Sequence, residues 1–373
     1  MITKVSIKNL KKLDDISFNL SNAVVIVGPN NSGKTSMLQA LCLWEIGVRT
    51  YYLNNIENAE KQENSILTIN RKDVVNSPIF DTKDLWLDAT IETENAKSIF
   101  IEIAVEGEVN GENWLSTLVF KHENRESLSF EIKNGHEILE KLLRTDSVVR
   151  FGFVQVLAGL SLEEDRLTRG SILRKLGEGR TSEVLRNICL DILQQDIDRN
   201  DLDKKTSSWQ RLVEHLKAAF GIELQTPELQ NTGLLQLKYK ENGHLREISA
   251  AGRGFQQTLL LLAYMYAHPS TILLLDEPDA HLEIIRQRQI FKLLNNVAAE
   301  VNSQIIIASH SEVILNEAAM QSSVIALIEN RVLEINKADN PQQYKAIEKA
   351  LTQIGFNSNL FFEKLCKTPC ITL

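Results

Sequence analysis

Residues 28–35 read GPNNSGKT, and this octapeptide limits what the chain can fold into more than any other segment. It follows the aliphatic run Ala23–Val27, which has the composition of a buried strand, and it precedes a helix-forming stretch that starts at Ser36. The order strand, glycine-rich loop, helix is the context that the Walker A pattern requires. The segment therefore predicts a phosphate-binding loop at the end of a buried strand.

Each part of this loop has a role toward ATP and Mg²⁺. Gly28 and Gly33 allow the backbone to turn tightly and to bring successive N–H groups around phosphate oxygens. Lys34 places a positive charge at the β- and γ-phosphates, the Thr35 hydroxyl is a ligand for Mg²⁺, and the helix N-terminus adds its dipole. We expect ATP to be held by Gly28, Asn30, Asn31, Ser32, Gly33, Lys34, Thr35 and Ser36.

Composition and charge restrict the cellular setting. The 373 residues are 43% hydrophobic and 24% charged, as in ordinary globular proteins, and no run of about 18 apolar residues is present to span a membrane. The four cysteines are too few and too scattered for a disulfide framework, which suits a reducing cytoplasm. The net charge of −8 is unlike that of proteins that coat DNA, so any DNA contact needs a local patch, an oligomer or a partner.

The hydrophobic pattern predicts strands before helices along the chain. Alternating apolar residues predict an antiparallel meander, whereas residues 50–82 are polar and irregular and predict a mobile loop region. Spacings of three and four predict helices from 161 to about 228, a hairpin follows around 241–243, and helix and strand then alternate to 336, which implies a parallel sheet. The expected strands are 5–7, 16–20, 86–91, 99–105, 115–120, 127–132 and 148–156, and further expected helices are 33–45, 137–143 and 342–354.

A second motif lies at residues 272–278, which read ILLLDEP. Four aliphatic residues in a row indicate a strand that is buried on both faces. Asp276, at the end of this strand, is suited to hold Mg²⁺ through water, and Glu277 is suited to polarise a water for in-line attack on the γ-phosphate. A Walker A loop followed by such a pair predicts an ATPase.

The stretch LLLDEPDAHLE at 273–283 resembles the ABC-type ATPases. The resemblance implies that His310, after the strand 304–309, is the switch histidine that contacts the γ-phosphate; the alternative is a histidine that caps a strand. It also implies that Gln155 is the Q-loop glutamine, with its amide oxygen near Mg²⁺ and the attacking water; the alternative is a polar residue at a strand end. The expected catalytic residues are Glu277, His310 and Gln155, and the expected Mg²⁺ ligands are Thr35, Asp276 and Gln155.

The segment that corresponds to the family's LSGGQ signature departs from it. It falls on 252–256, GRGFQ, where Gly254 and Gln256 match and Arg253 stands in place of a serine. In the family that serine contacts the γ-phosphate bound to the other subunit, and an arginine can do the same as a charged, bidentate donor. Alternatively, Ser249 or Gln256 takes this role after a small register shift. We expect nucleotide contacts from Arg253, Gly254 and Gln256.

The segments between the motifs indicate a branch of the family. They are longer than in transporter subunits, and no aromatic residue for adenine stacking lies between Leu20 and Gly28. The layout is similar to the SMC, RecF and OLD ATPases, and residues 276–283 with 308–311 are most similar to the OLD-like branch. Members of that branch occur in bacterial anti-phage systems with a TOPRIM nuclease attached or encoded nearby. Residues 369–373 fit the opening strand of such a nuclease domain or an edge strand of the sheet.

The resemblance implies an α/β ABC-ATPase head, with a mixed sheet, an antiparallel meander and flanking helices. Its lobe is expected at 1–160 and 233–340, with a helical insertion at 161–232 and a C-terminal helix and strand at 341–373. Two copies, or a higher oligomer, are expected to meet head to tail through ATP and to regulate a nuclease or toxin. The alternatives are a RecF- or SMC-like DNA-repair ATPase that binds DNA directly, an ATP-binding scaffold with little turnover, or a transporter subunit, which the long insertions disfavour.

Overall fold

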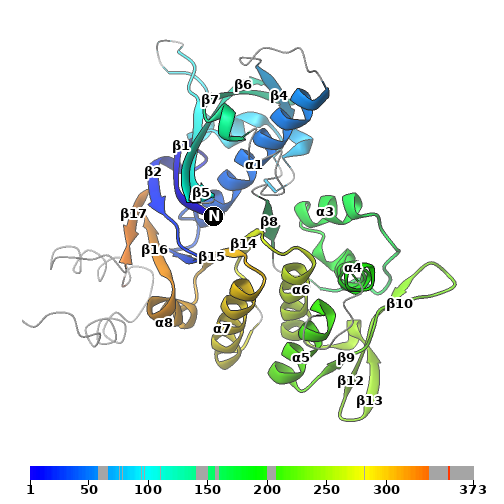
Figure 1. Ribbon diagram of the computed structural model, residues 1–373. Helices are drawn as coiled ribbons and strands as arrows, with labels where there is room; N and C mark the ends of the chain where they lie inside the picture. The colour runs from blue at the N-terminus through cyan, green and yellow to red at the C-terminus, as the bar shows by residue number, and fades with distance from the viewer. Residues whose placement is uncertain are drawn as a thin grey trace, which may run out of the picture. The chain divides into compact units, whose positions relative to one another are not determined.

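The computed structural model describes residues 1–57, 66–74, 76–77, 79–93, 95, 97–109, 111–139, 150–155, 159–199, 207–280, 282–335 and 352 (Figure 1). The chain divides into two compact units. Unit 1 comprises Met1–Phe151 and Ile306–Leu373, and unit 2 comprises Gly152–Ile305. The predicted lobe, insertion and extension stay predictions, and almost all of 341–373, including the helix expected at 342–354, lies outside the described residues.

A six-stranded antiparallel sheet forms one layer of unit 1, in the order β2-β1-β5-β6-β7-β4 (Figure 1). Alternate side chains are buried, as in the first pair, where Val5 lies opposite Phe18 and Ile7 lies opposite Ile16. This period of two gives the sheet one apolar face, as the sequence pattern predicts. The strands are β1 Ile2–Leu10, β2 Leu13–Asn19, β4 Leu67–Asn70, β5 Ile101–Val109, β6 Glu112–Asn124 and β7 Ser127–Asn134.

Helix α1, Lys34–Glu57, packs on this sheet and is longer than the sequence predicts. Trp44 stacks on Trp114 of β6, with ring centroids 6.1 Å apart. A Cβ at Gly47 would lie 2.3 Å from Leu118 Cδ2, so the glycine permits this close approach of helix and sheet. Tertiary packing therefore extends the helix beyond residue 45, and the loop expected from residue 50 was wrong for this part of the chain.

The strand expected at 86–91 is also wrong, because this region forms short 3₁₀ helices. They are η1 Arg71–Asp73, η2 Thr82–Leu85 and η3 Leu87–Ala89. Asp81 and Asp84 form a capping box that starts η2, and the Trp86 N–H then bonds to the Lys83 carbonyl oxygen at 2.9 Å. Asp88 has a φ of 50°, which takes the backbone out of the extended region. The pattern of apolar residues is thus the same as in a strand, but local capping decides the structure.

A second sheet carries the phosphate-loop strand. Its part in unit 1 has the order β17-β16-β3-β15, where β3 is Ala23–Val27, β15 Gln304–Ser309, β16 Ser323–Ile328 and β17 Arg331–Glu334. The boundary between the units falls within β15. Strands β16 and β3 pair in parallel, with Val25 opposite Val324 and Val27 opposite Ala326, and α8, Glu312–Gln321, packs on both. The parallel pairing that the sequence predicts is confirmed here.

Unit 2 is mainly helical and is built around α6, Arg253–Ala267. Every residue of α6 from Phe255 on is buried, because α4, α5 and α7 all pack against it (Figure 1). The predicted hairpin is confirmed, and Asn242 and Gly243 make its turn with positive φ. The helices are α3 Arg169–Gly177, α4 Leu185–Asp198, α5 Ser208–Phe220 and α7 Ile284–Glu300, with η4 Thr181–Glu183 and η5 Ile248–Ala250. The strands are β8 Phe151–Val154, β9 Glu223–Leu224, β10 Glu228–Leu229, β11 Leu235–Gln236, β12 Lys238–Glu241, β13 His244–Glu247 and β14 Ile272–Asp276.

Candidate functional site

The loop between β3 and α1 has the backbone of a phosphate-binding loop. Gly33 has a φ of 107° and Asn31 a φ of 66°, both in the left-handed half of conformational space. A Cβ at Gly28 would lie 2.5 Å from the Leu327 carbonyl oxygen, so this position must be glycine for the loop to lie against β16. Asn30 and Asn31 are exposed, and Thr35 and Ser36, in the first turn of α1, are partly exposed. Backbone N–H groups at the N-terminus of a helix bind anions, and α1 begins directly after this loop.

Lys34 lies within this loop rather than out in solvent. Its residue exposure is 6%, and its Nζ donates hydrogen bonds to the carbonyl oxygens of Gly28 at 2.9 Å and Pro29 at 3.0 Å. These two carbonyl oxygens hold the Lys34 Nζ against the start of the loop. This is where the sequence prediction places the cation for the β- and γ-phosphates.

The position of the Ser32 hydroxyl indicates whether this loop fits a triphosphate. Ser32 Oγ is buried and has no hydrogen-bond partner among the described residues. It lies at the inner side of the loop, since a Cβ at Gly28 would come within 2.8 Å of it. Buried hydroxyls are normally satisfied, so an orphan hydroxyl among loop amides is suited to donate to an anionic oxygen. The residues present therefore fit the phosphate groups of a nucleotide.

Lys12 is a residue near this loop that the sequence analysis did not assign. Together with Lys11 it forms the tight β1–β2 turn, and its Nζ donates to the Asn31 carbonyl oxygen at 3.2 Å. In the sequence Lys12 belongs to the basic stretch 8–12, whose pattern favours a solvated turn between two strands over a binding patch. Its side chain brings a second cation to the phosphate loop.

His310 follows the buried strand β15 in unit 1. Ser309 is buried and its Oγ accepts from the N–H of Ser311, which in turn caps α8 by accepting from Ile314 N–H at 3.3 Å. His310 itself is exposed between these two serines. Strands β15 and β3 are neighbours, so His310 and Gly28 both follow strands of the same sheet. A role as γ-phosphate contact stays a prediction.

Asp276 and Glu277 end the buried strand β14 in unit 2. Residues 272–275 are buried, and both carboxylates are partly exposed. Glu277 has a φ of 49°, an uncommon backbone conformation for a residue with a side chain, and such conformations cluster at functional sites. The turn is closed by the Ala280 N–H, which donates to the Glu277 carbonyl oxygen at 3.0 Å. Glu277 thus lies in a closed turn directly after β14.

Gln155 lies at the end of β8 and contacts the loop after α3. A Cβ on Gly179, which has a φ of 73°, would lie 2.6 Å from Gln155 Oε1. The loop is tightly bonded, with the Gly179 N–H on the Leu176 carbonyl oxygen and the Arg180 N–H on that of Lys175. Two side-chain hydrogen bonds, from Arg180 and Lys175, lower the pKa of Glu183 beside it to about 2. The glycine-flanked loop is thus a tight helix connection against which Gln155 rests.

The segment 252–256 forms the start of α6. Gly252 is its N-cap residue without a side-chain cap, and both Gly252 and Arg253 are exposed. Gln256 points the other way: it is buried, and its Nε2 donates to the carbonyl oxygens of Ile248 at 2.9 Å and Ser249 at 3.3 Å. The helix N-terminus, Gly254 and Arg253 are therefore placed to meet an anion, whereas the Gln256 side chain holds the preceding turn.

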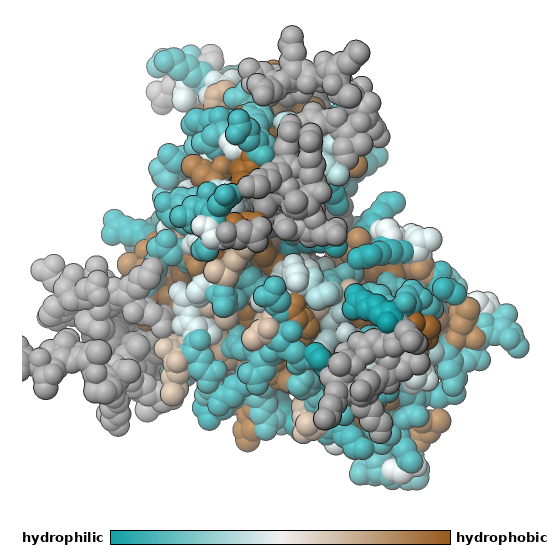
Figure 2. Space-filling model, viewed as in Figure 1, coloured by the Kyte–Doolittle hydropathy of each residue, from teal (hydrophilic) through white to brown (hydrophobic). Residues whose placement is uncertain are grey.

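The described residues hold no cluster of three or more histidine, cysteine, aspartate or glutamate side chains that could bind a metal ion on its own. Mg²⁺ needs few protein ligands when phosphate oxygens complete its shell, and the predicted set Thr35, Asp276 and Gln155 is of that kind. Within the described part of the chain no helix is both long and apolar enough to cross a bilayer. The face in Figure 2 is mainly polar, with apolar side chains in small groups.

Two protein-family models match this chain, one on each side of residue 155. The family described as "AAA ATPase domain" matches residues 1–149. The family described as "AAA domain, putative AbiEii toxin, Type IV TA system" matches residues 182–316. The chain is therefore similar to AAA ATPase domains over both the phosphate loop and the β14 segment.

Comparison with known proteins and solved structures shows further similarity in sequence and in fold. The ribose import ATP-binding protein RbsA 2 of Rubrobacter xylanophilus is 29% identical over 115 residues, 30% of this chain and 21% of that protein, so the chain spans about a fifth of this curated relative. An Smc head bound to the C-terminal winged-helix domain of ScpA matches with a TM-score of 0.54 and 16% identity, over 90% of this chain and 99% of that one. The Pyrococcus furiosus Smc head bound to the C-terminal domain of ScpA matches with a TM-score of 0.53 and 16% identity, over 93% and 98%. The fold is that of an SMC-like ATPase head, which confirms the predicted fold class.

Proposed function

We propose that this protein is a cytoplasmic ABC-type ATPase of the OLD-like branch that binds and hydrolyses ATP with Mg²⁺. The observation that carries the proposal is the phosphate loop itself, with Lys34 buried among loop carbonyls and the Ser32 hydroxyl without a partner among the described residues. A loop of this kind binds a triphosphate through amides, ammonium and hydroxyl together. The sequence matches to AAA ATPase domains support the same ligand.

Hydrolysis is assigned to Glu277, with His310 and Gln155 as further catalytic residues. The Glu277 carboxylate, held by its turn at the end of β14, is the base that orients a water toward the γ-phosphate. Mg²⁺, held by Thr35, Asp276 and Gln155, would neutralise charge on the phosphates. The side-chain oxygens of these three residues suit that ion.

Two copies of the chain would assemble head to tail around ATP. The support is the start of α6, where the exposed Arg253 and the helix N-terminus offer positive charge to a ligand that lies outside this protomer. A γ-phosphate held by the phosphate loop of one copy and by residues 252–256 of the other would join the two copies only while it is intact. Such a dimer converts hydrolysis into a change of assembly.

The regulated partner is proposed to be a nuclease or a toxin in bacterial anti-phage defence. The match of residues 182–316 to a family described by a toxin of a type IV toxin–antitoxin system supports a role in such a system. The two solved Smc heads are each bound to a domain of ScpA, so this head fold can carry a protein partner.

Substitution of Glu277 by glutamine tests the proposed chemistry. The amide keeps the size of the side chain but cannot take a proton from water, so we expect the turnover of ATP to fall about 10²-fold or more. ATP should remain bound, and light scattering should show a stable dimer. Glu283→Gln, an exposed carboxylate at the start of α7, is the matched control and should hydrolyse ATP as the wild type does. Wild-type turnover by Glu277→Gln would show that the base is assigned wrongly.

A further inference from the structure

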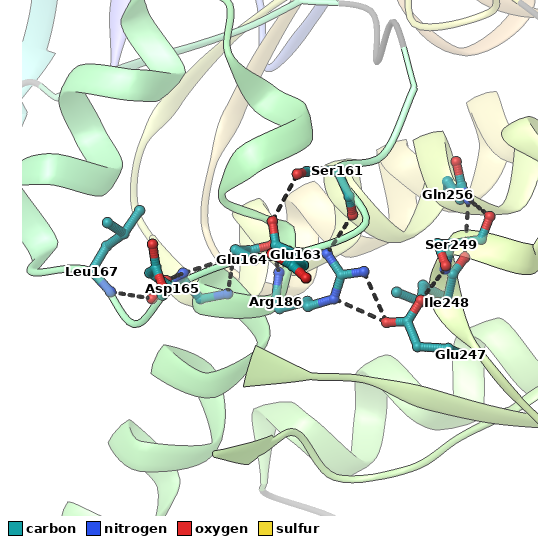
Figure 3. A network of polar contacts seen from close by, with 11 residues as sticks. Ser161, Glu163, Glu164, Asp165, Leu167, Arg186, Glu247, Ile248, Ser249 and Gln256 are labelled. Carbon is teal, nitrogen blue, oxygen red and sulfur yellow. Dashed lines mark hydrogen bonds and ion pairs between the residues drawn. The ribbon is translucent and has the colours of Figure 1, made fainter. Parts of the chain in front are cut away.

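A buried arginine connects the start of α4 to the turn that precedes α6 (Figure 3). The Arg186 side chain is fully buried, and its Nε and Nη2 donate to Glu247 Oε1 at 3.0 and 2.8 Å. Its Nη1 donates to the Ser161 carbonyl oxygen at 3.0 Å and lies 3.4 Å from Glu164 Oε2. One guanidinium thus joins α4 to two other segments of unit 2, the stretch 161–164 and the residue before η5.

Glu164 fixes the other side of this network to the first turn of α4. Its two carboxylate oxygens accept the backbone N–H groups of Arg186 at 3.0 Å and Asn187 at 2.7 Å. The N-cap residue of α4, Val184, has no side-chain cap, so Glu164 takes that role from a distant loop. Burial raises the pKa of Glu164, while the hydrogen bonds from Asn187 and Arg186 and the charge of Arg186 oppose this shift.

Glu247 carries the connection on to α6. It is the N-cap residue of η5, and its second carboxylate oxygen accepts the Ser249 N–H at 2.6 Å. The carbonyl oxygens of Ile248 and Ser249 are held in turn by the Gln256 side chain (Figure 3). The short turn η5 is therefore fixed from both sides, by Arg186 through Glu247 and by α6 itself. Only Ala251 and Gly252 separate it from the first residue of α6.

The buried ion pairs of Arg186 fix the positions of the segments they join more than they raise the free energy of unfolding. A buried ion pair contributes little net stability because desolvation offsets the attraction, yet its fixed distances define one arrangement of the groups it joins. Two N–H groups of Arg186 converge on Glu247 Oε1, and this charge-assisted contact is directional, so a displacement of α4 is transmitted to η5. A cluster of apolar side chains at the same place would not constrain the direction in this way.

We infer that Arg186 and Glu247 are positioning residues that hold residues 252–256 in the orientation needed to contact ATP bound to a second copy. This inference rests on the proposed function, and it adds a route by which the position of α4 controls assembly. A ligand or partner that shifts α4 would alter the contact of Arg253 with the γ-phosphate without touching the nucleotide. The phosphate loop lies in unit 1 and takes no part in this network.

Substitution of Glu247 by glutamine tests the inference. The amide has one acceptor oxygen where the carboxylate uses two, so either the Arg186 guanidinium or the Ser249 N–H loses its partner. We expect ATP-dependent dimerisation and kcat each to fall about tenfold, with the affinity of protomers for ATP, measured with a fluorescent analogue, within about twofold of the wild type. Glu247→Asp keeps both acceptors and should restore part of the loss. Arg186→Lys keeps the charge without the pair of N–H donors that converge on Glu247 Oε1, and it should match Glu247→Gln.

The matched control is Asp196→Asn at the other end of α4. Asp196 is also a buried carboxylate, and it accepts from Ser207 Oγ and the Trp209 N–H at 2.8 Å each, but it has no contact with η5. Asp196→Asn should lower the melting temperature, whereas its dimerisation at low temperature should equal that of the wild type. Equal loss of dimerisation in Asp196→Asn and Glu247→Gln, or none in Glu247→Gln, overturns the inference. Absence of ATP-dependent dimers in Glu277→Gln overturns instead the proposed function on which it rests.

Discussion

At the scale of single residues, the Ser32 hydroxyl is expected to lower the stability of the protein and to raise its affinity for ATP. A buried hydroxyl without a partner costs the folded state about 1–3 kcal/mol, and an alanine in its place removes that cost. The same hydroxyl is the group that would donate to a phosphate oxygen when the nucleotide is bound. Stabilising substitutions at functional positions commonly carry such a loss of activity.

Ser32→Ala is therefore expected to have two opposite effects. The free energy of unfolding without nucleotide should rise by about 1–3 kcal/mol, and the affinity for ATP should fall about tenfold, as measured by denaturation and calorimetry. Ser116→Ala is the control, because Ser116 Oγ is equally buried and without a partner among the described residues but belongs to β6. Ser116→Ala should change the free energy of unfolding by the same amount as Ser32→Ala and leave the affinity for ATP unchanged. If Ser32→Ala binds ATP with unchanged affinity, the Ser32 hydroxyl does not contact the nucleotide.

The sequence predicts a site residue well when the groups that position it lie close to it along the chain. Residues 28–36 form one continuous loop and helix start, so their identity and spacing suffice to predict the strand, the turn and the buried Lys34. Gln256 is different, because its inward side chain depends on the carbonyl groups of a turn eight residues earlier. Arg186 could not be found at all, since its carboxylate partners lie 22 and 61 residues away. Contacts at such separation leave no pattern in a single sequence.

At the scale of elements, the two wrong predictions have different causes, tertiary packing for α1 and local capping for Leu87–Ala89. Helix α1 continues to Glu57 because Trp44 and Gly47 pack it on the antiparallel sheet, although asparagines near its end are weak helix formers. The 3₁₀ turn at Leu87–Ala89 forms because Asp81 and Asp84 cap the turn before it. Strands and helices with long periodic patterns were predicted well, whereas tertiary packing and capping decided the remaining ends.

The packing of α1 also desolvates a carboxyl, which gives a prediction for stability against pH. Burial raises the pKa of Glu45 to about 7, against the opposing charge of Arg49 and a hydrogen bond from Phe151 N–H. Between pH 4.5 and 7 the folded state therefore binds more protons than the unfolded state, so stability falls as pH rises through this window, by up to about 3 kcal/mol. Glu45→Gln should lack this decline and should be more stable than the wild type at pH 8.

Urea denaturation of both proteins at several pH values measures this difference. Glu102→Gln is a suitable control, because Glu102 forms a more exposed ion pair with Lys133 on the sheet, and its removal should be nearly neutral. Parallel pH profiles for Glu45→Gln and the wild type would show that the Glu45 carboxyl is hydrated in the folded state.

At the scale of the whole molecule, the residues assigned to ATP are distributed over both units. Unit 1 carries the phosphate loop and His310, and unit 2 carries Asp276, Glu277, Gln155 and the start of α6. The motifs could be predicted from sequence because each is a short segment next to a buried strand or helix. Their proposed assembly around one nucleotide could not, since groups from distant segments and from a second copy leave no local pattern in the sequence. The head-to-tail arrangement is therefore the point that most needs its own test.

A mixture of two inactive variants provides that test. Lys34→Ala removes the cation of the phosphate loop, and Arg253→Ala removes the proposed contact to the other copy, so each variant alone should lack ATP turnover. In a head-to-tail dimer of one copy of each, one site combines an intact loop with an intact Arg253. An equal mixture should then regain up to about a quarter of wild-type turnover, since about half of random dimers are mixed and each has one complete site. If each protomer instead completes its own pocket, the mixture stays inactive at every ratio, because no pocket contains both side chains.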